Sequence, residues 1–380
     1  PLTEGITDRW LRRLVKTALD GFASHVEDPI PASIRAREGL PDLATALHAM
    51  HFPRDADELE LGRRRLCFEE FLLIQLGVAR KRRAWRSHQG IALTPSPLVD
   101  RFAASLPFQL TNAQQRVWQQ IAQDLGAAVP MSRLLQGDVG SGKTVVAAMA
   151  MLQAAASGYQ AALMAPTEIL ATQHYDSLCS LLGEIALTRN GTQEPLRIAL
   201  LTGSLRAREK GEVRDTVAAG QIDIVVGTHA LIQEGVQFDR LGLIVVDEQH
   251  RFGVEQRMTL RQRGGAVAVP HMLVMTATPI PRTLALTIYG DLDISVIDEM
   301  PPNRQQVITH LLEPRERERA YRFVRSQVEK GRHAFVICPL VEESDHLEAK
   351  SATEEFGRLQ EEVFPDLRIA LLHGRMRSDE

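Results

Sequence analysis

The residues from Gly137 to Thr144 have the types and the spacing that bind nucleotide phosphates. They match the pattern GxxxxGK[ST] and lie between an apolar run and a helical stretch. Glycines let backbone N–H groups turn toward phosphate oxygens, and a following helix N-terminus adds positive potential. Lys143 is placed to reach the β- and γ-phosphates, and the Thr144 hydroxyl to bind Mg²⁺. A glycine-rich turn before a helix is the alternative, but the context favours a cofactor site made of Gly137, Asp138, Val139, Gly140, Ser141, Gly142, Lys143 and Thr144.

Two adjacent carboxylates follow a second apolar run, Leu243–Val246. At the carboxyl end of a sheet strand, Asp247 is placed to hold Mg²⁺ near the phosphates, and Glu248 to polarise an attacking water. An acidic cap after a strand is the common alternative. A phosphate loop on the same sheet favours the catalytic interpretation.

Two further segments carry weaker signals. Thr276 and Thr278 follow another apolar run. Two hydroxyls at alternate positions there can link the part of the protein that binds nucleotide to the part that binds a polynucleotide. A Ser/Thr-rich turn before a helix is the alternative. Phe108 can stack on a base and the Gln114 amide can read its edge, while Thr111 between them is a good helix N-cap in either case.

The elements that must position these side chains form an α/β pattern from Thr111 onward. Short apolar runs alternate with helical stretches, which is typical of a parallel sheet buried on both faces with right-handed βαβ crossovers. The expected strands are Arg133–Gln136, Ala161–Ala165, Ile198–Leu201, Ile222–Val226, Leu243–Val246 and Met272–Met275.

The segments before and after this α/β pattern are predicted to have different structures. Residues 1–105 carry apolar side chains at helical spacing, with the longest expected helix over Leu59–Val78. A stiff Met-Pro-Pro connector at Met300 precedes a second α/β unit. We expect its first strands at Val307–Leu311, Ala334–Cys338 and Ile369–Leu372. The predicted domains are therefore residues 1–105, 106–300 and 301–380.

Composition narrows the class of protein. A net charge of −4 argues weakly against a nucleic-acid partner, although the basic run from Arg80 to Arg86 either touches DNA or is a solvated helix end. Cys67, Cys179 and Cys338 lie far apart without metal-binding spacing, so we expect no structural zinc and a reducing cytoplasm. No apolar stretch is long enough to span a bilayer, so we expect no membrane partner.

Four motifs together resemble a known family. GDVGSGKT, APTEIL, DEQHRFGVEQR and TATPIPR occur in the order of superfamily 2 helicase motifs. VDEQHRFGVEQR and MTATPIPRTLALTIYGDLDISVIDEMPPNR resemble the RecG family in particular, and ALHAMHFP and RRRLCFEEFLLIQL resemble the helical linker before its motor. The resemblance covers essentially the whole chain. The motor of a transcription-repair coupling factor is the alternative, because it shares a TATPIPRT-like run; the YGDLDISVIDEMPP segment and the linker favour RecG.

The resemblance implies a RecA-like P-loop NTPase domain after a helical linker, followed by an incomplete second RecA-like domain. It implies an ATP-dependent DNA helicase that uses Mg²⁺ and acts as a monomer on branched double-stranded DNA, such as stalled forks and Holliday junctions, in repair and recombination.

The resemblance also implies roles for single residues. Gln249 and His250 would sense the γ-phosphate, Thr276 and Thr278 would couple hydrolysis to movement, and Phe108 with Gln114 would recognise adenine. Residues facing the DNA backbone, where contacts read no sequence, would be Thr167, Thr202, Gly203, Ser204, Thr228 and His229.

The same resemblance places an OB-type wedge domain before Pro1 and the arginine fingers after Glu380, so we expect the chain to be part of a longer protein. Two functions remain open. One is a motor, which the Asp247-Glu248 pair favours because binding alone needs no water-activating glutamate. The other, for these 380 residues alone, is a nucleotide-binding module without helicase turnover.

Overall fold

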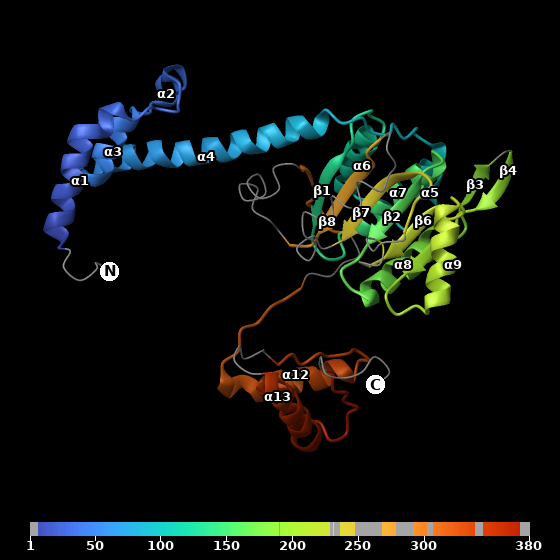
Figure 1. Cartoon of the computed structure of the whole chain (residues 1–380). Helices are drawn as coiled ribbons and strands as arrows, with labels where there is room; N and C mark the ends of the chain where they lie inside the picture. The colour runs from blue at the N-terminus through green and yellow to red at the C-terminus, as the bar shows by residue number, and fades with distance from the viewer. Residues whose placement is uncertain are drawn as a thin grey trace. The chain divides into compact units, whose positions relative to one another are not determined.

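The computed structural model divides into two units, Pro1–Arg304 and Gln305–Glu380, which are described separately (Figure 1). The described residues are 7–189, 191–228, 231, 236–247, 268–278, 292–301, 307–338 and 345–372. Within these ranges, no helix combines the length and apolar character needed to cross a membrane.

The first unit begins with helices, as the sequence predicts. They are α1 (Asp8–Phe22), α2 (Ala32–Glu38), α3 (Leu43–His51) and the long α4 (Ala56–Arg86). Helix α4 runs beyond the expected Leu59–Val78 at both ends. Asp55 caps its first turn by accepting the N–H of Glu58 at 2.7 Å, and the basic run continues it because arginine and lysine are good helix formers.

A buried ion network holds these helices together. Arg65 of α4 is fully buried and its guanidinium donates to Asp28 and to Glu69, each at 2.6 Å. Burial by itself would raise the pKa of Asp28. The N–H groups of Ile30 and Leu43, together with two guanidinium groups, outweigh it and hold the pKa of that carboxyl below its ordinary value. The charged form of Asp28 is therefore part of the folded state.

The end of α4 is attached to the sheet that follows. The Trp85 indole N–H donates to the carbonyl of Pro130 at 3.0 Å, and Arg82 pairs with Asp293. His271 is fully buried, accepts the N–H of Met131 at Nδ1 and donates through Nε2 to a carbonyl just after α4. Burial lowers the pKa of His271, which keeps it the neutral bridge that this geometry requires.

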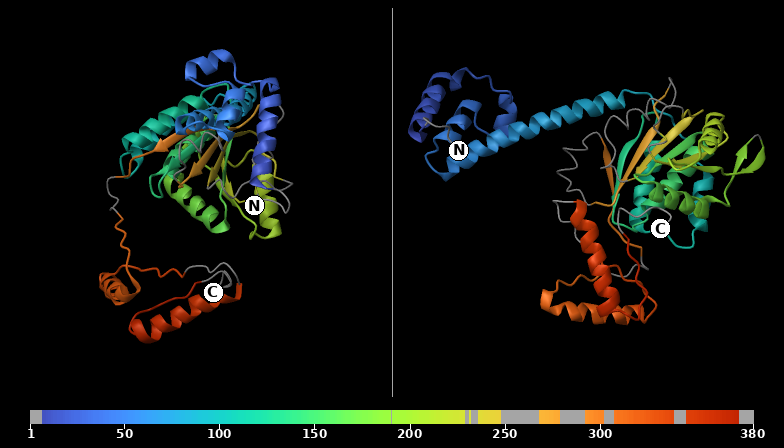
Figure 2. Two further views of the ribbon diagram at one scale, coloured as in Figure 1. Left: turned by 90° about the vertical axis from the view of Figure 1, so that its left-hand side faces the viewer. Right: turned by 60° about the horizontal axis from the view of Figure 1, so that its bottom comes forward.

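Seven parallel strands make the sheet of the first unit, in the order β5-β6-β2-β7-β8-β1-β9 (Figure 2 shows it from two further directions). Each of the six predicted strands is present, so the α/β prediction is confirmed. The strands are β1 (Ser132–Gly137), β2 (Gln160–Met164), β5 (Ile198–Leu201), β6 (Ile224–Gly227), β7 (Leu241–Asp247), β8 (His271–Thr276) and β9 (Asp293–Ile297).

The prediction did not include β9 or the antiparallel hairpin of β3 (Ala186–Arg189) and β4 (Thr192–Pro195). β9 lies at the edge of the sheet, and Val296 is 41% exposed there. The hairpin, seen beyond β6 in Figure 1, is mostly polar. Neither has the continuous apolar run by which a strand buried on both faces is recognised.

Both faces of the sheet are covered. Successive side chains of β2 alternate, with Leu163 in the core on one face and Met164 in the core on the other. The first core contains side chains of four helices, and the second contains Val217 of α9 (Ala207–Ala218). The four helices are α5 (Pro97–Ser105), α6 (Asn112–Leu125), α7 (Lys143–Ala156) and α8 (Glu168–Leu182).

The second unit contains α12 (Arg317–Val328) and α13 (Asp345–Arg358), with a 3-10 turn at Pro314–Glu316 and a π-helical turn at Leu359–Val363. The predicted strands at 307–311, 334–338 and 369–372 are wrong for this structure, because no described residue there pairs in a sheet. Leu311 is 99% exposed. A short apolar run becomes a strand only when a neighbouring strand bonds its backbone.

Candidate active site

The phosphate loop, residues 137–144, joins the carboxyl end of β1 to the first turn of α7. Gly140 and Gly142 have φ angles of 78° and 90°, a left-handed conformation that side chains disfavour. The Lys143 ammonium donates to the carbonyl of Gly137 at 2.7 Å and to that of Asp138 at 3.0 Å. The lysine thus folds over its own loop, on the side where phosphates bind in such loops.

The side chain of Gln114, on α6, holds the phosphate loop through a hydrogen bond to its backbone. Its amide N–H donates to the carbonyl of Ser141 at 2.7 Å, and its amide oxygen accepts the N–H of Thr111 at 2.9 Å. Thr111 in turn caps α6, as the sequence predicts. A Cβ on Gly142 would lie 2.2 Å from the Gln114 amide nitrogen, so glycine is required there by contact as well as by conformation.

The Ser141 hydroxyl is the feature of the loop that points to a ligand. Ser141 is 1% exposed, and its Oγ has no hydrogen-bond partner among the described residues. Buried polar atoms are nearly always paired, so an unpaired hydroxyl inside a glycine-rich loop fits an arriving anion. The residues present therefore suit a phosphate group.

Asp247 and Thr276 lie at the same edge of the sheet as the phosphate loop. β8 lies between β7 and β1, and its Met275 and Thr276 are in register with Asp247 and Gln136. The Thr276 and Thr278 hydroxyls are 2.9 Å apart. We call the carboxyl ends of β7, β8 and β1 the nucleotide half of this edge. Three expected catalytic residues lie outside the described residues: Glu248, Gln249 and His250.

His174 is a site residue that the sequence interpretation missed. It lies on α8, and its Nε2–H donates to Asp247 Oδ2 at 2.7 Å. Both side chains are largely buried, at 13% and 12% exposure. The two residues are 73 positions apart in the sequence, so no local motif could have shown the contact.

The residues predicted to face DNA gather at the ends of β2, β6 and β5, which we call the hydroxyl half of the edge. Thr167 caps α8 by accepting the N–H of Leu170 at 3.3 Å. Thr202 is 3% exposed, and its hydroxyl lies 3.1 Å from that of Ser204. Gly203 passes close to α8, and Thr228 directly follows β6. His229 lies outside the described residues.

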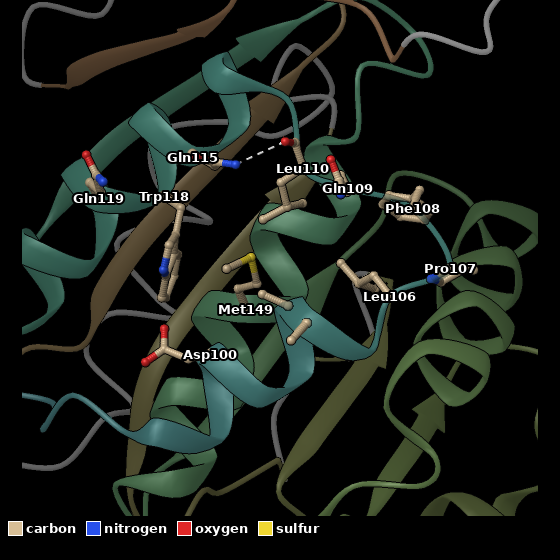
Figure 3. Close-up of a pocket in the computed structure, with 12 residues that line it drawn as sticks. Asp100, Leu106, Pro107, Phe108, Gln109, Leu110, Gln115, Trp118, Gln119 and Met149 are labelled. Atoms are coloured by element: carbon tan, nitrogen blue, oxygen red, sulfur yellow. Dashed lines mark hydrogen bonds between the residues drawn. The ribbon is translucent and has the colours of Figure 1, made fainter.

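Phe108 is placed apart from Gln114. It lines a cavity of about 660 Å³ between α5, α6 and α7, and it is 43% exposed. Figure 3 shows Trp118, Leu110 and Met149 lining the same cavity. Gln114 is not among the described lining residues, and both ends of its amide are bonded to protein groups. A shared adenine contact by Phe108 and Gln114 stays a prediction.

The donor set of the nucleotide half fits Mg²⁺. Thr144 and Asp247 offer only oxygen atoms, which magnesium prefers, and magnesium usually takes few protein ligands beside phosphates and water. In the described part of the chain, no three His, Cys, Asp or Glu side chains cluster as a metal site. Cys67, Cys179 and Cys338 are free thiols.

The fold and the site define a P-loop domain of the type found in DEAD/DEAH box helicases. A parallel sheet carries the phosphate loop and an aspartate at one edge, and the family model of the DEAD/DEAH box helicases matches residues 111–287. The chain is 50% identical to the "ATP-dependent DNA helicase RecG" of Synechocystis sp., over 100% of this chain and 44% of the relative. It is 47% identical to the protein of the same name in Bacillus subtilis, over 99% of this chain and 54% of the relative.

The structural comparison agrees. A solved structure described as RecG bound to a three-way DNA junction superposes with a TM-score of 0.77 at 40% identity, covering 96% of this chain and 47% of that one. The chain belongs to the RecG family of ATP-dependent DNA helicases and spans about half the length of the curated relatives it matches. The family predicted from the sequence motifs is thereby confirmed.

Proposed function

We propose that this chain forms the motor of an ATP-dependent helicase that remodels branched double-stranded DNA during repair and recombination. The observation that carries the proposal is the arrangement of one sheet edge. Its nucleotide half presents Lys143, Ser141 and Asp247, and its hydroxyl half presents Thr202 and Ser204. The names of the relatives support the same function, and one of them binds a three-way junction.

In the nucleotide half, Lys143 exchanges its two carbonyl partners for the β- and γ-phosphates of ATP. Thr144 and Asp247 would hold Mg²⁺, which neutralises phosphate charge when bound. Glu248 takes part by polarising the attacking water, with Gln249 and His250 sensing the γ-phosphate. Phe108 and Gln114 recognise the adenine end.

In the hydroxyl half, small polar side chains and N–H groups contact the DNA backbone. Such contacts position the protein without reading bases, so binding is insensitive to sequence and is weakened by salt. The Thr276–Thr278 pair, which follows β8 in the nucleotide half, couples hydrolysis to movement. We further propose a monomeric motor in the cytoplasm, with the linker, first motor domain and second motor domain at residues 1–105, 106–300 and 301–380.

The test uses the full-length protein and a labelled three-way junction with homologous arms. We expect strand displacement with ATP and Mg²⁺ and none with a non-hydrolysable analogue. The same junction incubated with the Lys143→Ala protein is the control and should stay intact. A wild-type protein that binds the junction and hydrolyses ATP but never displaces a strand would leave only a nucleotide-dependent binding module.

A further inference from the structure

Helix α8 connects the two halves of the sheet edge. Its N-cap is Thr167, and its first-turn Glu168 lies so near Gly203 that a Cβ there would approach the Glu168 carboxylate to 2.7 Å. About two helical turns further on, His174 donates its hydrogen bond to Asp247 at 2.7 Å. One short helix therefore contacts a proposed DNA-facing turn at one end and the proposed metal-binding carboxylate in its middle.

Helix α8 packs against the core through one face. Ala171, Leu178 and Leu182 are fully buried in the core beneath it, on the face that also carries His174. An α-helix keeps its side chains in fixed register, so a shift at Thr167 displaces His174 relative to β7. The Asp247 carboxylate must then rotate or lose its partner.

The hydrogen bond from His174 also determines which oxygen of Asp247 is available to bind a metal. A carboxylate only accepts hydrogen bonds, so the proton lies on His174 Nε2, and this N–H donates to Asp247 Oδ2. A partner that holds one carboxylate oxygen fixes the orientation of the other. Partners of this kind are worth about 10- to 100-fold in metal affinity or activity.

Resting on the function proposed above, we propose that His174 is a positioning residue that couples DNA contact at the hydroxyl half to Mg²⁺ binding at Asp247. When DNA holds the N-terminus of α8, His174 presents the carboxylate to the metal. When the helix shifts, the carboxylate turns away and Mg²⁺-nucleotide binding weakens. DNA thereby tightens the metal site through a single hydrogen bond.

The experiment measures nucleotide binding rather than turnover. A fluorescent non-hydrolysable ATP analogue is titrated with Mg²⁺ on the full-length protein, with and without a forked duplex. The wild type should need less Mg²⁺ for half-maximal binding when DNA is present. His174→Leu fills the space without a donor, and His174→Asn is too short to reach. Each should raise the required Mg²⁺ about 10-fold and abolish the shift caused by DNA.

Two controls separate this role from packing. His174→Gln places an amide N–H close to the position of Nε2 and should behave like the wild type. Gln173→Leu changes an exposed neighbour on the same helix and should also behave like the wild type. If His174→Leu does not fold, the His174→Asn and His174→Gln pair decides, since the two differ by one methylene.

The inference fails if both His174→Leu and His174→Asn keep the wild-type Mg²⁺ requirement and the DNA shift. It fails equally if a folded His174→Gln protein behaves like His174→Leu, or if DNA causes no shift in the wild type. Lys143→Ala identifies a failure of the proposed function instead. If that variant binds the analogue as the wild type does, or the wild type binds none, the nucleotide site itself is misassigned and this inference is overturned with it.

Discussion

The two halves of the sheet edge are built differently, although both rest on the same seven strands. The nucleotide half is fixed by buried contacts that no ligand is needed to form, including the Gln114 amide behind the phosphate loop and the His174 bond to Asp247. In the hydroxyl half, the Thr202 and Ser204 hydroxyls bond each other in a short turn, and Thr167 caps α8. The nucleotide half is therefore suited to a ligand of fixed shape, and the hydroxyl half to a DNA backbone that passes over it.

The largest effect that this comparison predicts is at Lys143. Replacing it with alanine removes the cation that faces the phosphates, and ATP hydrolysis should fall on the order of 10²–10³-fold or more. DNA binding should remain, because the lysine lies in the other half. Steady-state hydrolysis and junction titrations on the full-length variant measure the two effects. Equal loss of hydrolysis and DNA affinity would show that the halves are not separable.

A smaller effect is expected at Gly142. Gly142→Ala places a Cβ against the Gln114 amide and adds the strain of a left-handed alanine, roughly 1–2 kcal/mol. Nucleotide affinity should fall about 10-fold or more, since that strain is joined by displacement of the loop. Gly158→Ala is the matched control, because Gly158 has φ 79° and its added Cβ would make only an ordinary contact, 3.9 Å from the Arg240 Nη1. It should lower the melting temperature alone; similar nucleotide affinities for both variants would rule out the Gln114 contact.

Variants of the hydroxyl half should show the reverse pattern. Thr202→Val and Ser204→Ala each remove one hydroxyl, which is worth about 2- to 10-fold in affinity when it contacts phosphate. Junction affinity should weaken by that amount on unrelated sequences alike, while affinity for the ATP analogue stays unchanged. Fluorescence anisotropy at two salt concentrations measures it. A loss confined to one DNA sequence would point to base reading instead.

The smallest effect on the site is expected from the helical region. The pKa of Asp28 is held below its ordinary value, so its contribution to stability is complete above about pH 4 and is lost as the pH falls through the folded value. The protection factors of amides in α2–α4, which correct for the slower intrinsic exchange in acid, should therefore fall as the pH falls. Asp28→Asn should already show fast exchange at pH 7 and keep normal ATP and DNA affinities. Unchanged exchange would mean that the buried network is dispensable.

Much of the first unit could be predicted because its signals are local. A strand buried on both faces appears as a continuous apolar run, and a phosphate loop as one short motif, so β1 and Gly137–Thr144 were both located from the sequence. β9 was missed because Ser295 and Val296 lie at an edge and do not form such a run. In the second unit the same type of run, at residues 334–338, does not pair in a sheet. A local apolar run indicates a tendency to form a strand, and the presence of a neighbouring strand determines whether it pairs in a sheet.

The residues of the candidate site could likewise be predicted only where a local motif indicates them. Motif spacing indicated Lys143 and Asp247, but it could not indicate that Gln114 bonds the phosphate loop or that His174 bonds Asp247. Those contacts depend on how α6 and α8 lie against the sheet. The adenine contact expected of Phe108 and Gln114 stays a prediction, and the structure adds that the Gln114 amide bonds Thr111 and Ser141. Roles that depend on two elements meeting cannot be obtained from one segment.

We propose that one sheet edge joins ATP hydrolysis to contact with branched DNA. The most direct test is steady-state ATP hydrolysis by the full-length protein with no DNA, with linear duplex and with a forked duplex, at two salt concentrations. We predict strong stimulation by the fork, less by the linear duplex, and loss of both as salt rises, since phosphate contacts are screened. A hydrolysis rate that is the same with and without DNA would contradict the account.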